Sequence, residues 1–189
     1  MRNYAEEFYV QSLSSLNMQI LFETTRLIFR RFTEADAALI LQLNSDPEVL
    51  KYLHEPVLQD LEHARKIIRE IILPQYENNL GRWAMHLKEN NEFIGWCGLK
   101  FRPEIDEIDL GYRLQKKYWG MGFATESARK TLDVGFNVLG LHTITGRAHI
   151  ENVSSLRVLE KIGMKFIKEE VIDDCLVKTF IAENPIRSI

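Results

Sequence analysis

The stretch that decides the fold reads KYWGMG over residues 117–122 and continues as FATESA over residues 123–128. Residues 105–114, just before it, alternate like a β-strand, and the residues after it repeat apolar side chains at helical spacing. Gly120 and Gly122 are therefore expected where a strand passes into a helix. The first turn of a helix has unpaired N–H groups and the positive end of the helix dipole. One interpretation is a phosphate or pyrophosphate site with Lys117 adding positive charge, and the other is a β–α turn without a ligand.

Working outward, the sequence predicts an α+β (α/β) domain in the order β-α-α-β-β-β-α-β-α-β-β. Helices are expected after the capping box of Thr33 and Asp36, after Asp60, after Gly122 and after Asn152. The three strands before the glycine pair follow one another with short turns, which is typical of an antiparallel meander. Strands are expected over residues 25–32, 82–88, 92–101, 105–114, 141–149, 165–172 and 176–182.

Two common nucleotide motifs do not fit the glycine pair. The dinucleotide fingerprint needs a glycine or alanine three residues after the second glycine, and here that residue is Thr125. The P-loop needs four residues between its glycines and then Lys-Ser/Thr, which is absent. A nucleotide-binding protein therefore stays a minor alternative.

Four segments together resemble the GNAT acetyltransferases. Residues 117–128 resemble the pyrophosphate-binding motif of that family, and Asn152–Met164 is similar to its Asn-x-x-Ser helix. Thr25–Arg30 resembles the opening strand of the ribosomal-protein N-terminal acetyltransferase (Rim-type) branch, and Asp109–Tyr112 resembles the acidic-Leu/Ile-Gly-Tyr segment of that branch. The resemblance covers about residues 23–182. The chain departs from the family pattern at Lys117, which is commonly Arg or Gln, and at Met164, which is usually Phe.

The resemblance implies a mixed, mostly antiparallel central sheet of about seven strands, flanked by about four helices. It also implies that the sheet is splayed between its fourth and fifth strands, which here means a gap between residues 106–114 and 141–149. Residues 1–22 are then an N-terminal extension and residues 23–189 the GNAT domain.

The function implied is an acetyl-CoA-dependent N-acetyltransferase that moves an acetyl group to a primary amine by direct attack in a ternary complex. The strand that ends at Leu114 would pair with the pantetheine arm, and a backbone N–H near Leu114 would polarise the thioester carbonyl. The alternative is a catalytically silent acyl-CoA-binding sensor or interaction module. The residues expected to contact the cofactor are Tyr112, Arg113, Leu114, Lys117, Trp119, Gly120, Met121, Gly122, Phe123, Ala124, Thr125, Asn152 and Ser155.

Three residues are candidates for proton transfer. Strand alternation places Glu107 and Asp109 on one face, and we expect Asp109 to be the general base, with Glu107 in reserve. Both carboxylates can equally be solvated side chains of a half-exposed strand. Ser155 is the candidate acid for the departing thiolate, although a first-turn serine can simply bond to the backbone. Asn152 would bond to the pantetheine arm, cap its own helix, or do both.

Composition limits the partners. A formal net charge of -3 argues against nucleic acid, and no apolar stretch approaches the length of a membrane span. Cys97 and Cys175 form no CxxC pair, and no signal peptide is apparent, so we expect a cytoplasmic protein. The five histidines have no shared spacing, so no metal is expected.

The acceptor amine is the least determined partner. The loops expected to line its path carry acidic residues, which would suit a cationic amine or a basic protein N-terminus, although solvated loop acids explain them too. Monomer and homodimer are both open. The loop acids are Asp46, Glu48, Glu55, Asp173 and Asp174.

Overall fold

One sheet of eight strands forms the centre of the molecule. The computed structural model describes residues 20–53, 55–172 and 174–184, so most of the expected N-terminal extension lies outside the described residues. The strands are β1 (Ile20–Glu23), β2 (Leu27–Arg31), β3 (Gly81–Leu87), β4 (Phe93–Arg102), β5 (Glu107–Leu114), β6 (Thr143–His149), β7 (Lys165–Ile172) and β8 (Cys175–Glu183). Their spatial order is β1-β2-β3-β4-β5-β6-β8-β7.

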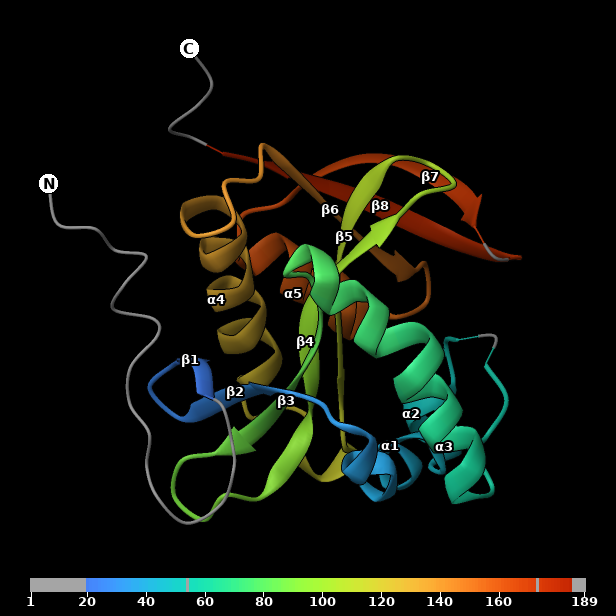
Figure 1. Cartoon of the computed structure of the whole chain (residues 1–189). Coiled ribbons are helices and arrows are strands. Elements are labelled where there is room, and N and C mark those ends of the chain that lie inside the picture. Colours follow the sequence, from blue (N-terminus) through green and yellow to red (C-terminus); the bar gives the residue numbers. More distant parts are fainter. Residues whose placement is uncertain (1–19, 54, 173, 185–189) are drawn as a thin grey trace, which may run out of the picture.

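Helices cover both faces of this sheet (Figure 1). The helices α1 (Ala37–Asn44), α2 (Pro47–Leu50) and α3 (Leu61–Ile67) lie on one face, and α4 (Phe123–Asn137) and α5 (Val153–Lys161) lie on the other. After α3 the chain continues through a π-helical turn, η2 (Ile68–Ile72), and a 3₁₀ segment, η3 (Leu73–Asn78). Shorter 3₁₀ turns are η1 (Glu34–Asp36) and η4 (Lys116–Tyr118). The expected fold class, a mixed and mostly antiparallel sheet with helices around it, is confirmed.

Helix starts follow the capping signals in the sequence. Asp36 accepts a hydrogen bond from the Thr33 N–H at 2.7 Å, and Asp60 accepts one from the His63 N–H at 2.8 Å. Each carboxylate satisfies an N–H group that a helix end would otherwise leave unpaired. These local bonds fix where η1, the helix α1 that follows it, and α3 begin.

The sheet opens between β5 and β6, as expected. These two strands are the parallel neighbours in an otherwise antiparallel sheet, and they pair only at Asp109 with Thr145 and at Leu110 with Gly146. Beyond Leu110, β5 continues to pair with β4, while β6 continues to pair with β8. Residues 111–114 therefore turn one backbone edge toward a neighbour that has diverged from them.

The numbers of elements differ slightly from the expectation of about seven strands and four helices. The additional strand is β1, which pairs with β2 and stacks Phe22 on Phe29 with ring centroids 4.4 Å apart. Its sequence shows no alternation that would announce a strand, so tertiary pairing creates it. The additional helix is α2, which Pro47 starts in its first turn.

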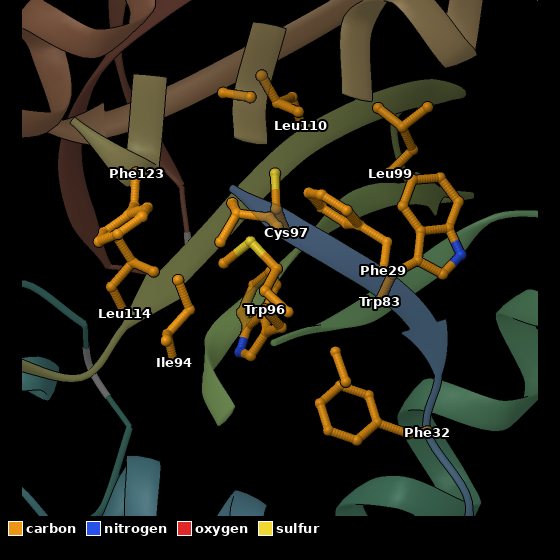
Figure 2. Packing of buried hydrophobic residues seen from close by; sticks show 14 of the residues in the cluster. Phe29, Phe32, Trp83, Ile94, Trp96, Cys97, Leu99, Leu110, Leu114 and Phe123 are labelled. Atoms are coloured by element: carbon orange, nitrogen blue, oxygen red, sulfur yellow. The ribbon is translucent and has the colours of Figure 1, made fainter. Parts of the chain in front are cut away.

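The core packs tightly around β4. Figure 2 shows buried side chains of neighbouring strands and of α4 gathered about this strand, among them Phe29, Cys97, Leu110 and Phe123. Gly98 lies in β4 because β3 approaches it closely, and a methyl group added there would lie 1.9 Å from the Gly81 carbonyl oxygen.

Gly98→Ala should therefore lower the free energy of unfolding by about 3 kcal/mol, because a strand must move to accept the methyl group. Gly111→Ala, at the position opposite in β5, is the matched comparison, since its methyl group would meet only the Trp96 ring at 3.4 Å. It should cost about 1 kcal/mol or less. Urea denaturation of the two variants measures the difference, and equal midpoints would contradict the account.

Candidate active site

The glycine pair lies at the N-terminal end of α4. Gly120 and Gly122 have φ angles of 77° and 83°, which residues with side chains rarely adopt. Gly122 precedes the first turn of α4, and no side chain caps that turn. The N–H groups of the turn are thus left for a partner from outside the helix, and the geometry can bind an anion.

Arg26, in the turn between β1 and β2, holds this loop in place. Its guanidinium donates to the Met121 carbonyl oxygen at 3.0 Å and to Glu126 Oε2 at 2.7 Å, and lies 4.0 Å from the centroid of the Phe123 ring. Thr24 donates to the second oxygen of Glu126 at 2.6 Å. Burial raises the pKa of Glu126, but the hydrogen bonds from Thr24 and Arg26 outweigh it and hold that pKa below its usual range. The loop is therefore fixed from a distant part of the chain.

Two loop residues expected to contact the cofactor have protein partners. The Lys117 ammonium forms an ion pair with Glu92 in the turn before β4, so its charge is directed to that carboxylate. Trp119 donates its indole N–H to the Leu114 carbonyl oxygen at 2.9 Å and leaves 45% of its surface exposed. Trp119 thereby ties the end of β5 to the loop.

A hollow of about 820 Å³ runs beside the loop, along the outer face of α4. Gly122 and Thr125 line it near the start of the helix. Its charged lining consists of three cations and two acids, with Lys130 paired to Asp133: Arg129, Lys130, Lys161, Glu126 and Asp133. A second hollow of about 490 Å³ lies on the other side, against Lys116 and Lys117. The glycine loop is thus bordered by space and by charged side chains.

Tyr112 and Ser155 face each other at the opening between β5 and β6. The Tyr112 hydroxyl is buried and has no hydrogen-bond partner in the part of the chain that the structure describes. Burial raises the pKa of Tyr112 to about 12, and the Ser155 hydroxyl lies close enough to lower it slightly without a hydrogen bond of normal length. A tyrosine with this pKa stays protonated and can donate to a ligand that enters the opening.

Asn152 caps the N-terminus of α5, which is one of the roles that its residue type predicts. Its side-chain oxygen accepts a hydrogen bond from the Ser155 N–H at 3.1 Å and so caps α5. This capping interpretation is confirmed, and it positions Ser155 in the first turn beside Tyr112.

The two candidate bases share one arginine. Arg147 of β6 donates to Asp109 Oδ1 at 2.8 Å and also forms an ion pair with Glu107, while its Nε lies 3.6 Å from Glu170 of β7. Thr179 donates to Glu170 at 2.6 Å. The parity of β5 correctly placed Glu107 and Asp109 on one face, but they form a buried charged cluster there and are not simply solvated.

Burial dominates the chemistry of Asp109. Although 20% of its side-chain surface is exposed, its carboxyl is packed deeply among other atoms, and desolvation raises its pKa to about 6 despite the opposing effect of Arg147. The carboxyl is therefore ionised at neutral pH but more basic than an ordinary aspartate. That is the property expected of a general base.

Several acids of the acceptor loops have protein partners. Asp46 accepts from the Glu48 N–H at 2.9 Å and caps α2, and Glu48 lies 3.5 Å from the Lys116 ammonium. Glu55 forms an ion pair with Arg113 at 2.9 Å. Asp173 lies outside the described residues. Two of the five expected loop acids, Glu48 and Glu55, are therefore paired with cations.

Sequence reasoning missed three supports of the site: Arg26, Arg147 and Glu170. A signal existed for Arg147, because Thr145, Arg147 and His149 put polar side chains on one face of an otherwise apolar strand. For Arg26 and Glu170 the partner becomes visible only once the order of the strands is known. Among the described residues, no three His, Cys, Asp or Glu side chains form a metal-binding group, and no helix is long and apolar enough to cross a membrane.

Comparison with known proteins agrees with this architecture. Residues 26–165 match the acetyltransferase (GNAT) domain model. The chain is 35% identical over 152 residues to the uncharacterized N-acetyltransferase p20 of Bacillus licheniformis, which covers 80% of this chain and 84% of that protein.

Two solved structures are similar in fold. One is the spermidine N-acetyltransferase of Vibrio cholerae in complex with CoA and spermine, with a TM-score of 0.71 at 19% identity over 84% of this chain and 95% of that one. The other is RimL, a ribosomal L7/L12 alpha-N-protein acetyltransferase in complex with coenzyme A, with a TM-score of 0.74 at 18% identity over 87% and 97%. The splayed sheet with its glycine loop thus defines an acyltransferase fold. The chain belongs to the GNAT acetyltransferase family, and its enzyme class is N-acetyltransferase.

The raised pKa of Asp109 predicts that its carboxylate costs stability. Since the folded-state pKa of about 6 lies above the ordinary 3.8, stability falls as pH rises through this interval. Asp109→Asn should raise the free energy of unfolding at pH 8 by roughly 1–3 kcal/mol. At pH 3 the two proteins should be equally stable. Urea denaturation at both values measures this.

Asp133→Asn is the matched control. Burial raises the pKa of Asp133, but hydrogen bonds from Lys130 and Asn137 outweigh it and lower that pKa, so its carboxylate stabilises the fold above its ordinary pKa. This variant should lose stability at pH 8. A loss in both variants would contradict the burial argument for Asp109.

Proposed function

We propose that this enzyme transfers the acetyl group of acetyl-CoA to a primary amine, by direct attack of the amine in a ternary complex. The observation that carries the proposal is the opening between β5 and β6. There an unpaired strand edge, a buried hydroxyl that has no hydrogen-bond partner among the described residues, and a glycine loop at a helix N-terminus lie along one path. The strand edge matches the amide arm of acetyl-CoA, the hydroxyl matches its thioester, and the glycine loop matches its pyrophosphate.

The residues fit the co-substrate in chemical terms. The N–H groups from Gly120 to Thr125 would hold the pyrophosphate, and the hollow beside Arg129 would take the nucleotide end. The edge of residues 111–114, apart from the Leu114 carbonyl oxygen that accepts from Trp119, would bond to the pantetheine amides as a neighbouring strand would. Lys117 would assist only after leaving Glu92.

The site has groups that can accept and donate the protons of direct acetyl transfer. The amine nitrogen bonds to the acetyl carbon, the carbon–sulfur bond breaks, and the amine proton must leave while the sulfur is stabilised. Asp109 would accept the proton because burial makes its carboxylate more basic, with Glu107 on the same face of β5 in reserve. Tyr112 and Ser155 would donate hydrogen bonds to the departing sulfur from the other face.

A covalent route through cysteine has little support. Cys97 is fully buried, lies 3.2 Å from the Thr131 hydroxyl, and burial raises the pKa of its thiol to about 11. It therefore remains a thiol and not the thiolate that a nucleophile needs. Both cysteines are free, which also supports the proposed cytoplasmic location.

The acceptor is a primary amine of a protein N-terminus or of a small molecule. Either is cationic before it loses its proton, and Asp109 and Glu107 are carboxylates that would face it. Thr25–Arg30 and Asp109–Tyr112 support the Rim-type branch as the finer assignment. The use of Arg26 to hold the glycine loop gives the first of these segments a physical reason.

Thiol release from acetyl-CoA tests the reaction. Protein N-terminal peptides, amino acids, polyamines and aminoglycosides are offered as acceptors, and one class should release CoA. Asp109→Asn should lower kcat by about a hundredfold or more, because a positioned general base is lost. Tyr112→Phe and Ser155→Ala should each lower kcat by about tenfold, with an unchanged KM for the acceptor. Glu62→Gln, which changes an exposed carboxylate of α3 that pairs with Arg65, should match the wild type.

Two negative results of this thiol-release test would have different meanings. Silence with every amine while CoA still raises the melting temperature would favour the silent acyl-CoA-binding module. Silence without stabilisation by CoA would overturn the proposed co-substrate.

The pH profile tests Asp109 independently. With the base titrating near 6 and the amine titrating at about 8 or above, log kcat/KM should rise with slope 2 below pH 6 and slope 1 above it. Asp109→Asn should show slope 1 throughout. An acidic limb that persists in this variant would assign the base to another group.

A further inference from the structure

A cationic cluster lies on the acceptor face of the sheet and is not used by the proposed chemistry. It consists of Arg82 of β3, Trp96 of β4 and Arg113 of β5. Strand register puts them on the face that also carries Asp109, because Arg82 is opposite Gly98, Gly98 is opposite Gly111, and Trp96 is opposite Arg113. The guanidinium carbons of Arg82 and Arg113 lie 4.6 and 5.7 Å from the centroid of the Trp96 ring. We name these three residues the arginine–tryptophan cluster.

Arg113 is already engaged by polar groups. Its Nη1 donates to Asn44 Oδ1 of α1 at 2.6 Å, and its Nη2 donates to Glu55 Oε1 at 2.9 Å. Only 5% of the Arg113 side chain is exposed, whereas 43% of the Glu55 side chain is exposed. The carboxylate is thus the more exposed partner of a buried guanidinium, and it shows that a planar carboxylate fits there.

Arg82 has no such partner. No carboxylate or carbonyl accepts a hydrogen bond from its guanidinium among the residues that the structure describes. Burial, followed by repulsion from Arg113, lowers the pKa of Arg82 to about 10. A half-buried arginine without an acceptor is costly, so a ligand that provides one gains free energy.

The local charges do not balance. Glu55 is the carboxylate on which Arg113, Arg82 and Lys100 all act, and each lowers its pKa, although burial opposes them. Lys100 lies opposite Asp109 in the strand register and also acts on that carboxylate, so the excess positive charge comes from two guanidiniums, Arg82 and Arg113, beside one partly exposed carboxylate. This composition contrasts with the acidic funnel that the loop sequence suggested, and it attracts an anion.

The cluster also lies at a useful distance from the opening. Arg82 is two strands from β5, or about 10 Å by sheet geometry. An acceptor amine placed beside Asp109 would therefore meet Arg82 with a group several bonds away. The planar guanidinium, held on Trp96, presents an N–H edge that matches a carboxylate.

We propose that the arginine–tryptophan cluster binds a carboxylate of the acceptor, so that the preferred substrate is a primary amine that carries a carboxylate several bonds from its nitrogen. This inference rests on the proposed acetyl transfer, because it names the acceptor of that reaction. An acidic side chain near a peptide N-terminus and the carboxylate of an ω-amino acid share this chemistry.

Matched acceptors test the proposal. Peptides that differ only by Glu or Gln near the N-terminus keep the amine almost unchanged, and free amino acids are compared with ω-amino acids. The acidic peptide should show a KM at least tenfold below that of its Gln counterpart, since a charge-assisted pair is worth about one decade or more. A preference for ω-amino acids over the peptides would assign the carboxylate to a small free acid, whereas a preference for α-amino acids would overturn the proposal, because their carboxylate is too close to the nitrogen.

Variants assign the effect to Arg82. Arg82→Gln should remove the Glu preference and leave both kcat with the Gln peptide and the KM for acetyl-CoA within twofold. Arg82→Lys should keep part of the preference for the Glu peptide. It replaces Arg82→Gln as the test variant if Arg82→Gln does not fold. Arg69→Gln is the control, because Arg69 is an exposed arginine that pairs with Glu34 elsewhere.

Equilibrium binding of the same peptides, measured by calorimetry in the presence of CoA, separates this proposal from the proposed function. Binding of the Glu peptide that Arg82→Gln abolishes, without thiol release, would keep the carboxylate site and overturn the acetyl transfer. Thiol release with equal KM values for the Glu and Gln peptides would keep the transfer and overturn the carboxylate site. The absence of both peptide binding and thiol release would overturn the carboxylate site and the acetyl transfer together.

Discussion

The arrangement of the site depends on the short pairing between β5 and β6. The strands β5 and β6 share only two residue pairs, because β5 follows β4 and β6 follows β8 as the sheet twists apart. Backbone polar groups inside a protein are nearly always paired, so a free edge in the middle of a sheet calls for an outside partner. The glycine loop begins where this free edge ends. The geometry of the opening thereby sets both the place and the direction of a bound chain-like molecule.

Charge on the two faces of β5 is arranged for different tasks. On one face Arg147 joins Glu107, Asp109 and Glu170 into a cluster in which the burial of Asp109 exceeds the compensation that the arginine gives. On the other face Tyr112 keeps its proton because its surroundings are apolar. In the proposed reaction this strand would separate the proton acceptor, Asp109, from the hydrogen-bond donor, Tyr112.

Local signals were sufficient for much of this fold. The capping box at Thr33 and Asp36, the glycine pair before α4 and the alternation of β5 each act within a few residues, so the sequence predicted them. The sequence did not predict features that depend on residues brought together by the sheet. The strand β1 exists because β2 offers an edge, and the ion pair of Asp109 with Arg147 joins residues 38 positions apart. The charge balance around Glu55 was misjudged for the same reason, since Arg113 and Arg82 come from other strands.

The contacts of Arg26 have a consequence beyond local geometry. They join the first described hairpin to a loop about a hundred residues later in the chain, through Met121 and Glu126. Two sites that share a structural element are thermodynamically linked, and the linkage is reciprocal. Whatever strengthens the hold of the loop on an anion must also strengthen the attachment of the hairpin, and a strained hairpin must weaken the anion site. In the proposed enzyme, the N-terminal edge of the sheet would therefore be coupled to the nucleotide end of acetyl-CoA.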